Sequence, residues 1–247
     1  MKYLSIILLV ALNCHAGLIE YKAGDTTCEG YLAGATVPGK HPAVLIVHDW
    51  MGNGPFSMAK ADELAKLGYV AFAVDIYGKG VRPANAQEAG AQAGKFKADR
   101  ALLRARIRAA HDYLRNNAAV DPKRMAAIGY CFGGTTVLEL ARSGAEVAGV
   151  VSFHGGLDSP TPADAKQIKG KVLVLHGADD PYVPPAEVAG FEKEMTDAGV
   201  DWQLIKYSGA VHSFTNPQAN SKGAAYNERA DKRSWEAMKL FFAEIFR

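Results

Sequence analysis

The chain has 247 residues, of which 49% are hydrophobic, so it is long enough to bury one large core. Its formal net charge is +2 and 22% of its residues are charged, so no basic or acidic excess points to a nucleic acid or another strongly charged partner. These values favour a single domain that acts on a small molecule, and we expect a monomer.

The first sixteen residues have the pattern of an export signal. Lys2 gives a positive start, residues 3–12 form an apolar run, and Ala16 offers a small residue for cleavage. The run is shorter than the roughly 20 apolar residues that a membrane helix needs, so we expect no stable membrane span. Asn13 before Cys14 fits a lipoprotein signal poorly.

The sequence therefore predicts a signal peptide over residues 1–16, cleaved near Ala16, and a domain over residues 17–247 that reaches the bacterial periplasm or is secreted. This mature chain keeps two cysteines, Cys28 and Cys131. Because an exported protein meets an oxidising compartment, one alternative is that the two thiols form a disulfide.

In chain order, residues 18–21 and 31–33 are weaker strand candidates around a turn at Gly24, which indicates an antiparallel hairpin at a sheet edge. From Ala43 onward, short apolar runs alternate with longer amphipathic stretches, the pattern of a mostly parallel central sheet with helices on both faces. The runs typical of strands buried on both faces are residues 43–48, 69–74, 125–130, 147–153, 172–176 and 202–207. The predicted fold class is α/β, in one domain.

Three amphipathic stretches predict helices that pack on this sheet. Residues 57–67 are expected to form a helix that is ended by Gly68. Residues 77–85 are expected to form a loop at a strand end that borders the site. One long helix is expected to bury Phe96, Leu103, Ile107, Ala110 and Leu114 and to expose Arg100, Arg104 and Arg108 to solvent. The C-terminal helix is expected to bury Trp235, Met238, Phe242 and Ile245.

The stretch GYCFGG, residues 129–134, follows an apolar strand and opens a helix, which is the context of a nucleophile elbow. Such a turn strains the backbone of its central residue, and glycines two positions away avoid clashes with side chains. The free N–H groups of the next helix favour a thiolate at Cys131. The alternative is a buried structural cysteine in a tight turn.

Two further segments supply the partners that a nucleophile needs. The stretch HGADDPYVP begins as a strand ends and offers Asp179 and Asp180, and the stretch GAVHSF follows the next strand and offers His212. The order nucleophile, acid, histidine is that of the α/β-hydrolase fold. The sequence therefore predicts a Cys-His-Asp triad at the strand ends.

With these motifs, the whole mature chain resembles the dienelactone hydrolase family. The resemblance rests on GYCFGG around Cys131, on Asp180 within DDPYVP, and on His212 within HSF. It implies the α/β-hydrolase fold and the roles of nucleophile, acid and base for these three residues. The family register before Pro184 favours Asp180 over Asp179 as the acid.

The resemblance extends to the stretch HDWMG after the first long apolar strand. It implies that Asp49 contacts the thiol and that the backbone N–H groups of Trp50 and Phe132 form the oxyanion hole. The founding family members have Glu where this chain has Asp49. They also hold a substrate carboxylate with two arginines, whose positions here correspond to Lys79 and Asn216, with Arg82 close by.

The sequence thus predicts a hydrolase that cleaves an ester or lactone of a small molecule through a thioester. Lys79, Arg82 and Asn216 are candidates for substrate binding, although a surface loop is an equal alternative. His154 is expected to be a hydrogen-bonded structural residue, and no spacing predicts a metal or cofactor site. The rival functions are a non-catalytic binding protein and a redox thiol protein that pairs Cys131 with Cys28.

Overall fold

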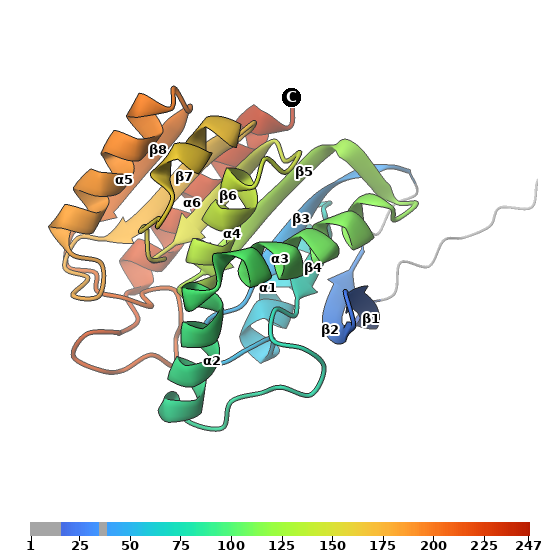
Figure 1. The fold of residues 1–247 in the computed structure, drawn as a ribbon, viewed down its shortest axis with the longest axis horizontal. Helices are drawn as coiled ribbons and strands as arrows, with labels where there is room; N and C mark the ends of the chain where they lie inside the picture. The colour runs from blue at the N-terminus through green and yellow to red at the C-terminus, as the bar shows by residue number, and fades with distance from the viewer. Residues whose placement is uncertain (1–15, 35–38) are drawn as a thin grey trace, which may run out of the picture.

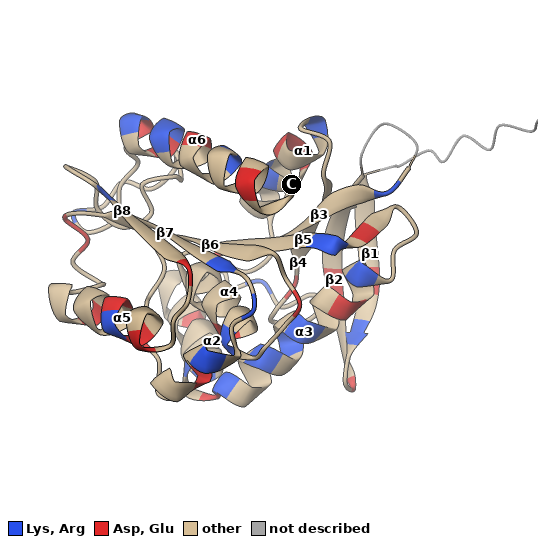
Figure 2. Ribbon diagram, turned by 90° about the horizontal axis from the view of Figure 1, so that it is seen from above, with Lys and Arg blue, Asp and Glu red and all other residues tan. Residues whose placement is uncertain are grey.

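The computed structural model describes residues 16–34 and 39–247, which form one eight-stranded sheet with helices on both faces (Figures 1 and 2). The predicted signal peptide lies outside the described residues except for Ala16. The strand order is β1-β2-β4-β3-β5-β6-β7-β8. The strands are β1 Gly17–Ala23, β2 Thr26–Ala33, β3 His41–Val47, β4 Val70–Val74, β5 Val120–Tyr130, β6 Gly149–Phe153, β7 Lys171–Gly177 and β8 Trp202–Tyr207.

The predicted sheet is confirmed, including the antiparallel hairpin of β1 and β2 at one edge. β2 also pairs antiparallel with β4, and every pairing from β4 to β8 is parallel. The main differences are that β2 begins at Thr26 rather than at Tyr31 and that β5 begins at Val120 rather than at Met125. The parallel pairings bring the carboxyl ends of six strands to one edge, where ligands bind in open α/β sheets.

The helices form two layers around the sheet. Figure 2 shows α1 and α6 on one face and α3, α4 and α5 on the other, with α2 on the same side as these three. Within the described ranges, no helix is both long and apolar enough to cross a membrane. The helices are α1 Pro55–Lys66, α2 Ala86–Ala98, α3 Arg100–Arg115, α4 Phe132–Arg142, α5 Pro185–Asp197 and α6 Glu228–Ile245, with a 3-10 helix η1 at Pro162–Gln167.

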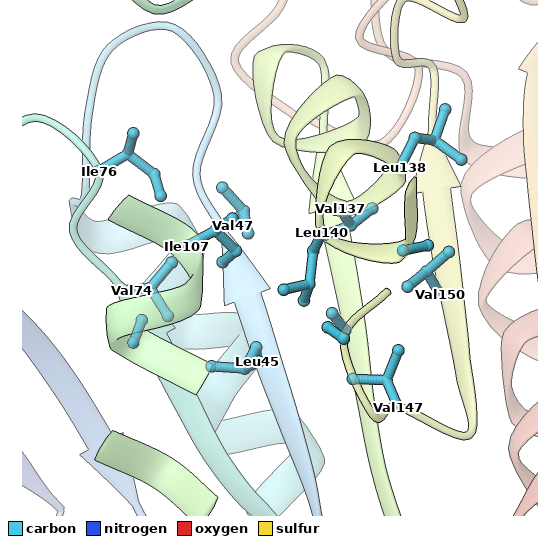
Figure 3. Close-up of a cluster of buried hydrophobic side chains, with 14 of the residues drawn as sticks. Leu45, Val47, Val74, Ile76, Ile107, Val137, Leu138, Leu140, Val147 and Val150 are labelled. Atoms are coloured by element: carbon cyan, nitrogen blue, oxygen red, sulfur yellow. The ribbon is translucent and has the colours of Figure 1, made fainter. Parts of the chain in front are cut away.

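Alternating residues of each strand build the two core layers. On β3, Leu45 and Val47 pack with Ile107 of α3 in the layer that Figure 3 shows, whereas Val44 and Ile46 pack on the opposite face toward α1 and α6. Because both faces are covered, every one of these strand residues is apolar. The hydrophobic runs in the sequence are therefore explained by burial on two sides.

The expected long helix is wrong, because the chain breaks it into α2 and α3 at Asp99. This residue has φ −115° and ψ 84°, outside the helical region, and its carboxylate accepts the Leu102 N–H at 2.9 Å as the N-cap of α3. Phe96 before the break and Leu103 after it are both buried in the same core layer. The apolar pattern therefore continues across the break and conceals it in the sequence.

Of the three arginines expected on a solvated face of α3, Arg108 is exposed as predicted, whereas Arg100 and Arg104 are bound to carboxylates. Arg100 pairs with Asp158 at 2.6 Å, and Arg104 binds both Glu139 and Asp164 at 2.7 Å. The Glu139 carboxylate is fully buried on α4 and needs cationic partners. These partners come from distant segments, so the local charge pattern could not reveal them.

Arg142, at the last turn of α4, is fully buried and joins this network to α5. Its guanidinium binds both carboxylate oxygens of Glu194, at 2.9 and 2.7 Å, and also Glu139 and the Leu157 carbonyl. Such a two-pronged contact fixes the relative position of the groups that it joins. The helix that follows the elbow is thereby held at its far end.

Candidate active site

Four of the predicted site residues follow the carboxyl ends of parallel strands. Asp49 comes after β3, Cys131 after β5, Asp180 after β7 and His212 after β8. The sheet therefore collects at one edge residues that are far apart in the sequence.

Cys131 occupies the sharp turn between β5 and α4. Its backbone has φ 55° and ψ −113°, a conformation that a residue other than glycine rarely adopts. A Cβ atom on Gly129 would lie 2.0 Å from the Gly133 carbonyl oxygen, and one on Gly133 would lie 2.3 Å from the Val47 oxygen. The elbow geometry expected from GYCFGG is present, and these two glycines are required for it.

The His212 ring lies against the acid that the sequence favoured. Its Nδ1 is 2.8 Å from the Asp180 carboxylate, whose side chain is fully buried. The other Asp180 oxygen accepts the Tyr182 N–H at 2.9 Å, which fixes the carboxylate. Asp179 is exposed and its backbone N–H bonds to the Ala210 carbonyl, so Asp180 and not Asp179 faces the histidine.

The charge state of His212 follows from its neighbours. Burial opposes protonation, but hydrogen bonds to Asp180 and to Cys131, together with the negative charges of both groups, raise the pKa of His212 to about 10. The ring therefore keeps its second proton well above the range of an ordinary histidine. A cationic imidazole beside a sulfur atom is the arrangement that stabilises a thiolate.

A strap after β8, residues 219–226, holds the backbone of His212. The Gly223 carbonyl accepts the His212 N–H at 3.2 Å, and the Ala225 N–H donates to the His212 carbonyl at 3.0 Å. A Cβ atom on Gly223 would lie 2.7 Å from the Tyr182 hydroxyl, so the strap packs closely on the segment that carries Asp180. The sequence analysis missed this strap, which has no regular periodicity.

Cys131 and His212 open into a cavity of about 500 Å³, within the range of small-molecule sites. Trp50, Phe132, Tyr182 and Val183 give it apolar walls, and the strap adds Ser221 and Ala224. Its lining is mostly apolar, and the Cys131 thiol and the His212 imidazole are its main reactive groups. This arrangement can bind a small, largely apolar molecule against a nucleophile.

Lys97 of α2 also lines the cavity, and the sequence analysis did not identify it. It is the one Lys or Arg among the described lining residues, it is exposed, and no carboxylate of the described chain pairs with it. The break at Asp99 directs α2 toward the site. Because the apolar face continues across this break, the sequence indicates one long helix and does not reveal the position of Lys97.

The predicted substrate-binding residues lie outside this cavity. Lys79 forms ion pairs with Glu20 and Glu29 of the edge hairpin. Arg82 and Asn216 line a second groove of about 840 Å³, and Arg82 lies 3.7 Å from the buried Asp75. The loop over residues 77–85 therefore borders that groove through Arg82.

The structure agrees with the positions predicted for the oxyanion donors, but it does not test the predicted contact of Asp49 with the thiol. Trp50 and Phe132 both line the cavity, and their backbone N–H groups have no partner among the described residues. Asp49 lines the second groove, its carboxylate accepts the Met51 N–H at 2.8 Å, and burial raises the pKa of Asp49. Its contact with the thiol stays a prediction.

His154 packs behind His212. Its Nε2 lies 2.8 Å from the Thr215 hydroxyl, and its ring lies edge-on to His212 at 5.3 Å between centroids. Burial and the nearby His212 lower the pKa of His154 well below its usual value, so the ring stays neutral. This is the hydrogen-bonded histidine that the sequence predicted.

The two mature cysteines are free, and the fold separates them. Cys28 is fully buried on β2, and β4 and β3 lie between β2 and β5. At roughly 4.8 Å per strand spacing, β2 and β5 are about 14 Å apart. This is well beyond the Cα–Cα separation of about 7 Å that a disulfide spans. The redox alternative is therefore wrong for the folded chain. In the described part, no three His, Cys, Asp or Glu residues are grouped to hold a metal ion.

The chain is similar to known proteins over most of its length. A protein of Aquifex aeolicus named "Putative carboxymethylenebutenolidase" is 30% identical over 229 residues, 91% of this chain and 96% of that protein. A Bradyrhizobium protein named "Probable 2-oxo-3-(5-oxofuran-2-ylidene)propanoate lactonase" is 32% identical over 195 residues, 74% of this chain and 77% of that protein.

Among solved structures, a dienelactone hydrolase-like promiscuous phosphotriesterase from metagenomic libraries is 38% identical, with a TM-score of 0.90 over 94% of this chain and 99% of the other. The sequence model of the dienelactone hydrolase family matches residues 28–246. The chain therefore belongs to the dienelactone hydrolase family.

Proposed function

We propose that the protein hydrolyses an ester or lactone of a small molecule through a thioester formed on Cys131. The observation that supports this most is the position of His212, which is hydrogen-bonded to the buried Asp180 and lines the same cavity as Cys131, whose negative charge helps to raise the pKa of His212. A nucleophile, a base and an orienting acid in contact form a unit for acyl transfer. Membership of the dienelactone hydrolase family supports a carboxylic ester hydrolase.

In the first half of the reaction, the Cys131 thiolate attacks the carbonyl carbon. The developing oxyanion is bound by the N–H groups of Trp50 and Phe132, which line the cavity and have no partner among the described residues. The C–O bond then breaks, the protonated His212 gives its proton to the leaving alkoxide, and an acyl thioester remains. With a lactone substrate, the alcohol stays attached to the acyl group.

In the second half, His212 accepts a proton from water, and the hydroxide attacks the thioester. The same donors bind the second oxyanion, the C–S bond breaks, and the Cys131 thiolate leaves. Asp180 holds Nδ1 of His212 and stabilises its cationic form in both halves. The names of the relatives support lactones as a substrate class, and the apolar cavity supports a compact one.

The rival function is a binding protein that has the fold without turnover. The strained elbow at Cys131 argues against it, because such backbone geometry persists where surrounding structure enforces it and is concentrated at functional sites. The raised pKa of His212 argues in the same direction.

Replacement of the nucleophile or the base should abolish turnover. We expect Cys131→Ala and His212→Ala each to lower kcat/KM for an aryl ester by about three orders of magnitude or more, because the members act as one unit. Ester kinetics with far-ultraviolet circular dichroism of each variant measures this. Asp179→Asn, on the exposed neighbour of the acid, is the matched control and should keep its activity. Unchanged hydrolysis by Cys131→Ala would refute the mechanism.

The pKa of His212 can be measured without turnover. Because Asp180 and Cys131 favour the charged ring, NMR titration should show His212 protonated as the pH rises past 7 and deprotonating near pH 10. Asp180→Asn removes the negative charge beside Nδ1, and should lower this pKa toward the ordinary histidine value. Asp179→Asn should leave it in place. Titration of the wild-type ring near pH 6.5 would contradict the arrangement.

Lys97 predicts a preference among substrates. As the one cation of the described cavity lining, it should favour an ester that carries a carboxylate away from the scissile bond. We expect Lys97→Gln to lower kcat/KM for such an ester by about twofold to fivefold, the effect of an exposed charge pair, and to leave a neutral ester unchanged. Lys95→Gln, on the same helix but outside the cavity, is the control. Equal effects on both esters would show that Lys97 does not select substrate charge.

A further inference from the structure

His48, at the end of β3, is a buried histidine that takes no part in the proposed steps. Its Nε2 accepts the Ile76 N–H at 3.3 Å, so the proton of the neutral ring resides on Nδ1. Burial lowers the pKa of His48, which keeps the ring neutral. Its Nδ1 is bonded to the Asp49 carbonyl oxygen, and therefore donates to it.

The contact with Asp49 determines the direction of the next N–H group. The described chain has no cis peptide bond, and in a planar trans peptide the N–H points opposite to the carbonyl. When His48 holds the Asp49 carbonyl, the Trp50 N–H must point away from the His48 ring. That N–H is one of the unpartnered donors at the cavity.

Tyr77 holds the following peptide. Its hydroxyl donates to the Trp50 carbonyl at 2.9 Å, and its own N–H bonds to the buried Asp75 carboxylate at 3.1 Å. The rings of His48 and Tyr77 pack edge-to-face, with centroids 4.8 Å apart. The carbonyls before and after the Trp50 side chain are therefore each bound by a side chain, and these two side chains support each other.

The same two rings contact the residue that supplies the second donor. Phe132 stacks on His48 with centroids 5.8 Å apart and an interplanar angle of 22°, and it lies 5.5 Å from Tyr77. One aromatic cluster thus joins the segment after β3, the loop after β4 and the first residue of α4. The two N–H groups at the cavity are carried by segments that this cluster packs together.

We propose that His48 and Tyr77 are positioning residues, which aim the Trp50 N–H at the oxyanion before substrate arrives. The inference rests on the proposed function, because it assigns these residues to the oxyanion site of that reaction. A donor that is already oriented needs no reorganisation in the transition state, which is the source of its effect on rate.

Variants of His48 can separate its two nitrogens. Asn at this position retains a donor at the δ position, Gln places its amide at the ε position, and Phe keeps the ring packing without either group. We expect His48→Asn to stay within about threefold of wild-type kcat/KM for an aryl ester, and His48→Gln and His48→Phe to lose about tenfold to a hundredfold, less than the removal of a whole donor. Tyr77→Phe, which removes one oxygen atom, should lose about tenfold. KM should change less than threefold in all four.

Two further measurements distinguish a changed direction of the Trp50 N–H from general damage to the active site. Alkylation of Cys131 by iodoacetamide forms no oxyanion, so its rate should be unchanged in every variant. Inhibition by a trifluoromethyl ketone, which forms an oxyanion on addition of the thiol, should weaken in proportion to kcat/KM. His111→Phe is the matched control, because His111 is buried and lies against the carbonyl of Glu146, which precedes the amino end of β6 at the edge of the sheet opposite to the site.

The inference is overturned if His48→Phe and Tyr77→Phe hydrolyse the ester like wild type, or if alkylation falls together with hydrolysis. It is also overturned if Asn is no better than Gln at position 48. Should the His48 variants fail to fold, Tyr77→Phe still decides the question. Failure of the proposed function is distinct, because the wild-type protein would then turn over no ester, or Cys131→Ala would retain the activity.

Discussion

The site depends on the left-handed backbone of Cys131, where β5 turns directly into α4. This turn places the thiol above the sheet edge and begins a helix whose first N–H groups have no internal partner. It exists only because Gly129 and Gly133 let the helix approach β5 and β3 more closely than any side chain would allow. The strain is held by packing at both ends: the rings of His48 and Tyr77 contact Phe132, and the buried ion pairs of Arg142 fix the last turn of α4.

Around this fixed point, the charged and polar groups are arranged from the most deeply buried to the one at the cavity. Asp180 is buried and bound by a backbone N–H, His212 is held by Asp180 and by the strap over residues 219–226, and the thiol faces the cavity. Each group is thus oriented by the one behind it. This order suits a reaction in which only the proton of His212 has to move between steps, while the acid and the donors stay in place.

Much of this could be predicted from the sequence, because strands covered on both faces leave continuous apolar runs and because GYCFGG allows few conformations. The failures have a common cause. The helix break at Asp99 was hidden by an apolar face that continues across it, and the partners of Arg100 and Arg104 come from segments distant in the chain. Lys97 and the strap reach the cavity only through tertiary structure, and Lys79 is held away from it by Glu20 and Glu29.

The central claim is that the acyl group is carried by the Cys131 sulfur, and mass spectrometry tests it most directly. Wild-type protein mixed with an ester that deacylates slowly, quenched in acid and digested, should give a peptide containing Cys131 with the added mass of the acyl group. The Cys28 peptide should be unmodified, because that thiol is buried on β2. Steady turnover with no acyl group on Cys131, or an acyl group on another residue, would contradict the account.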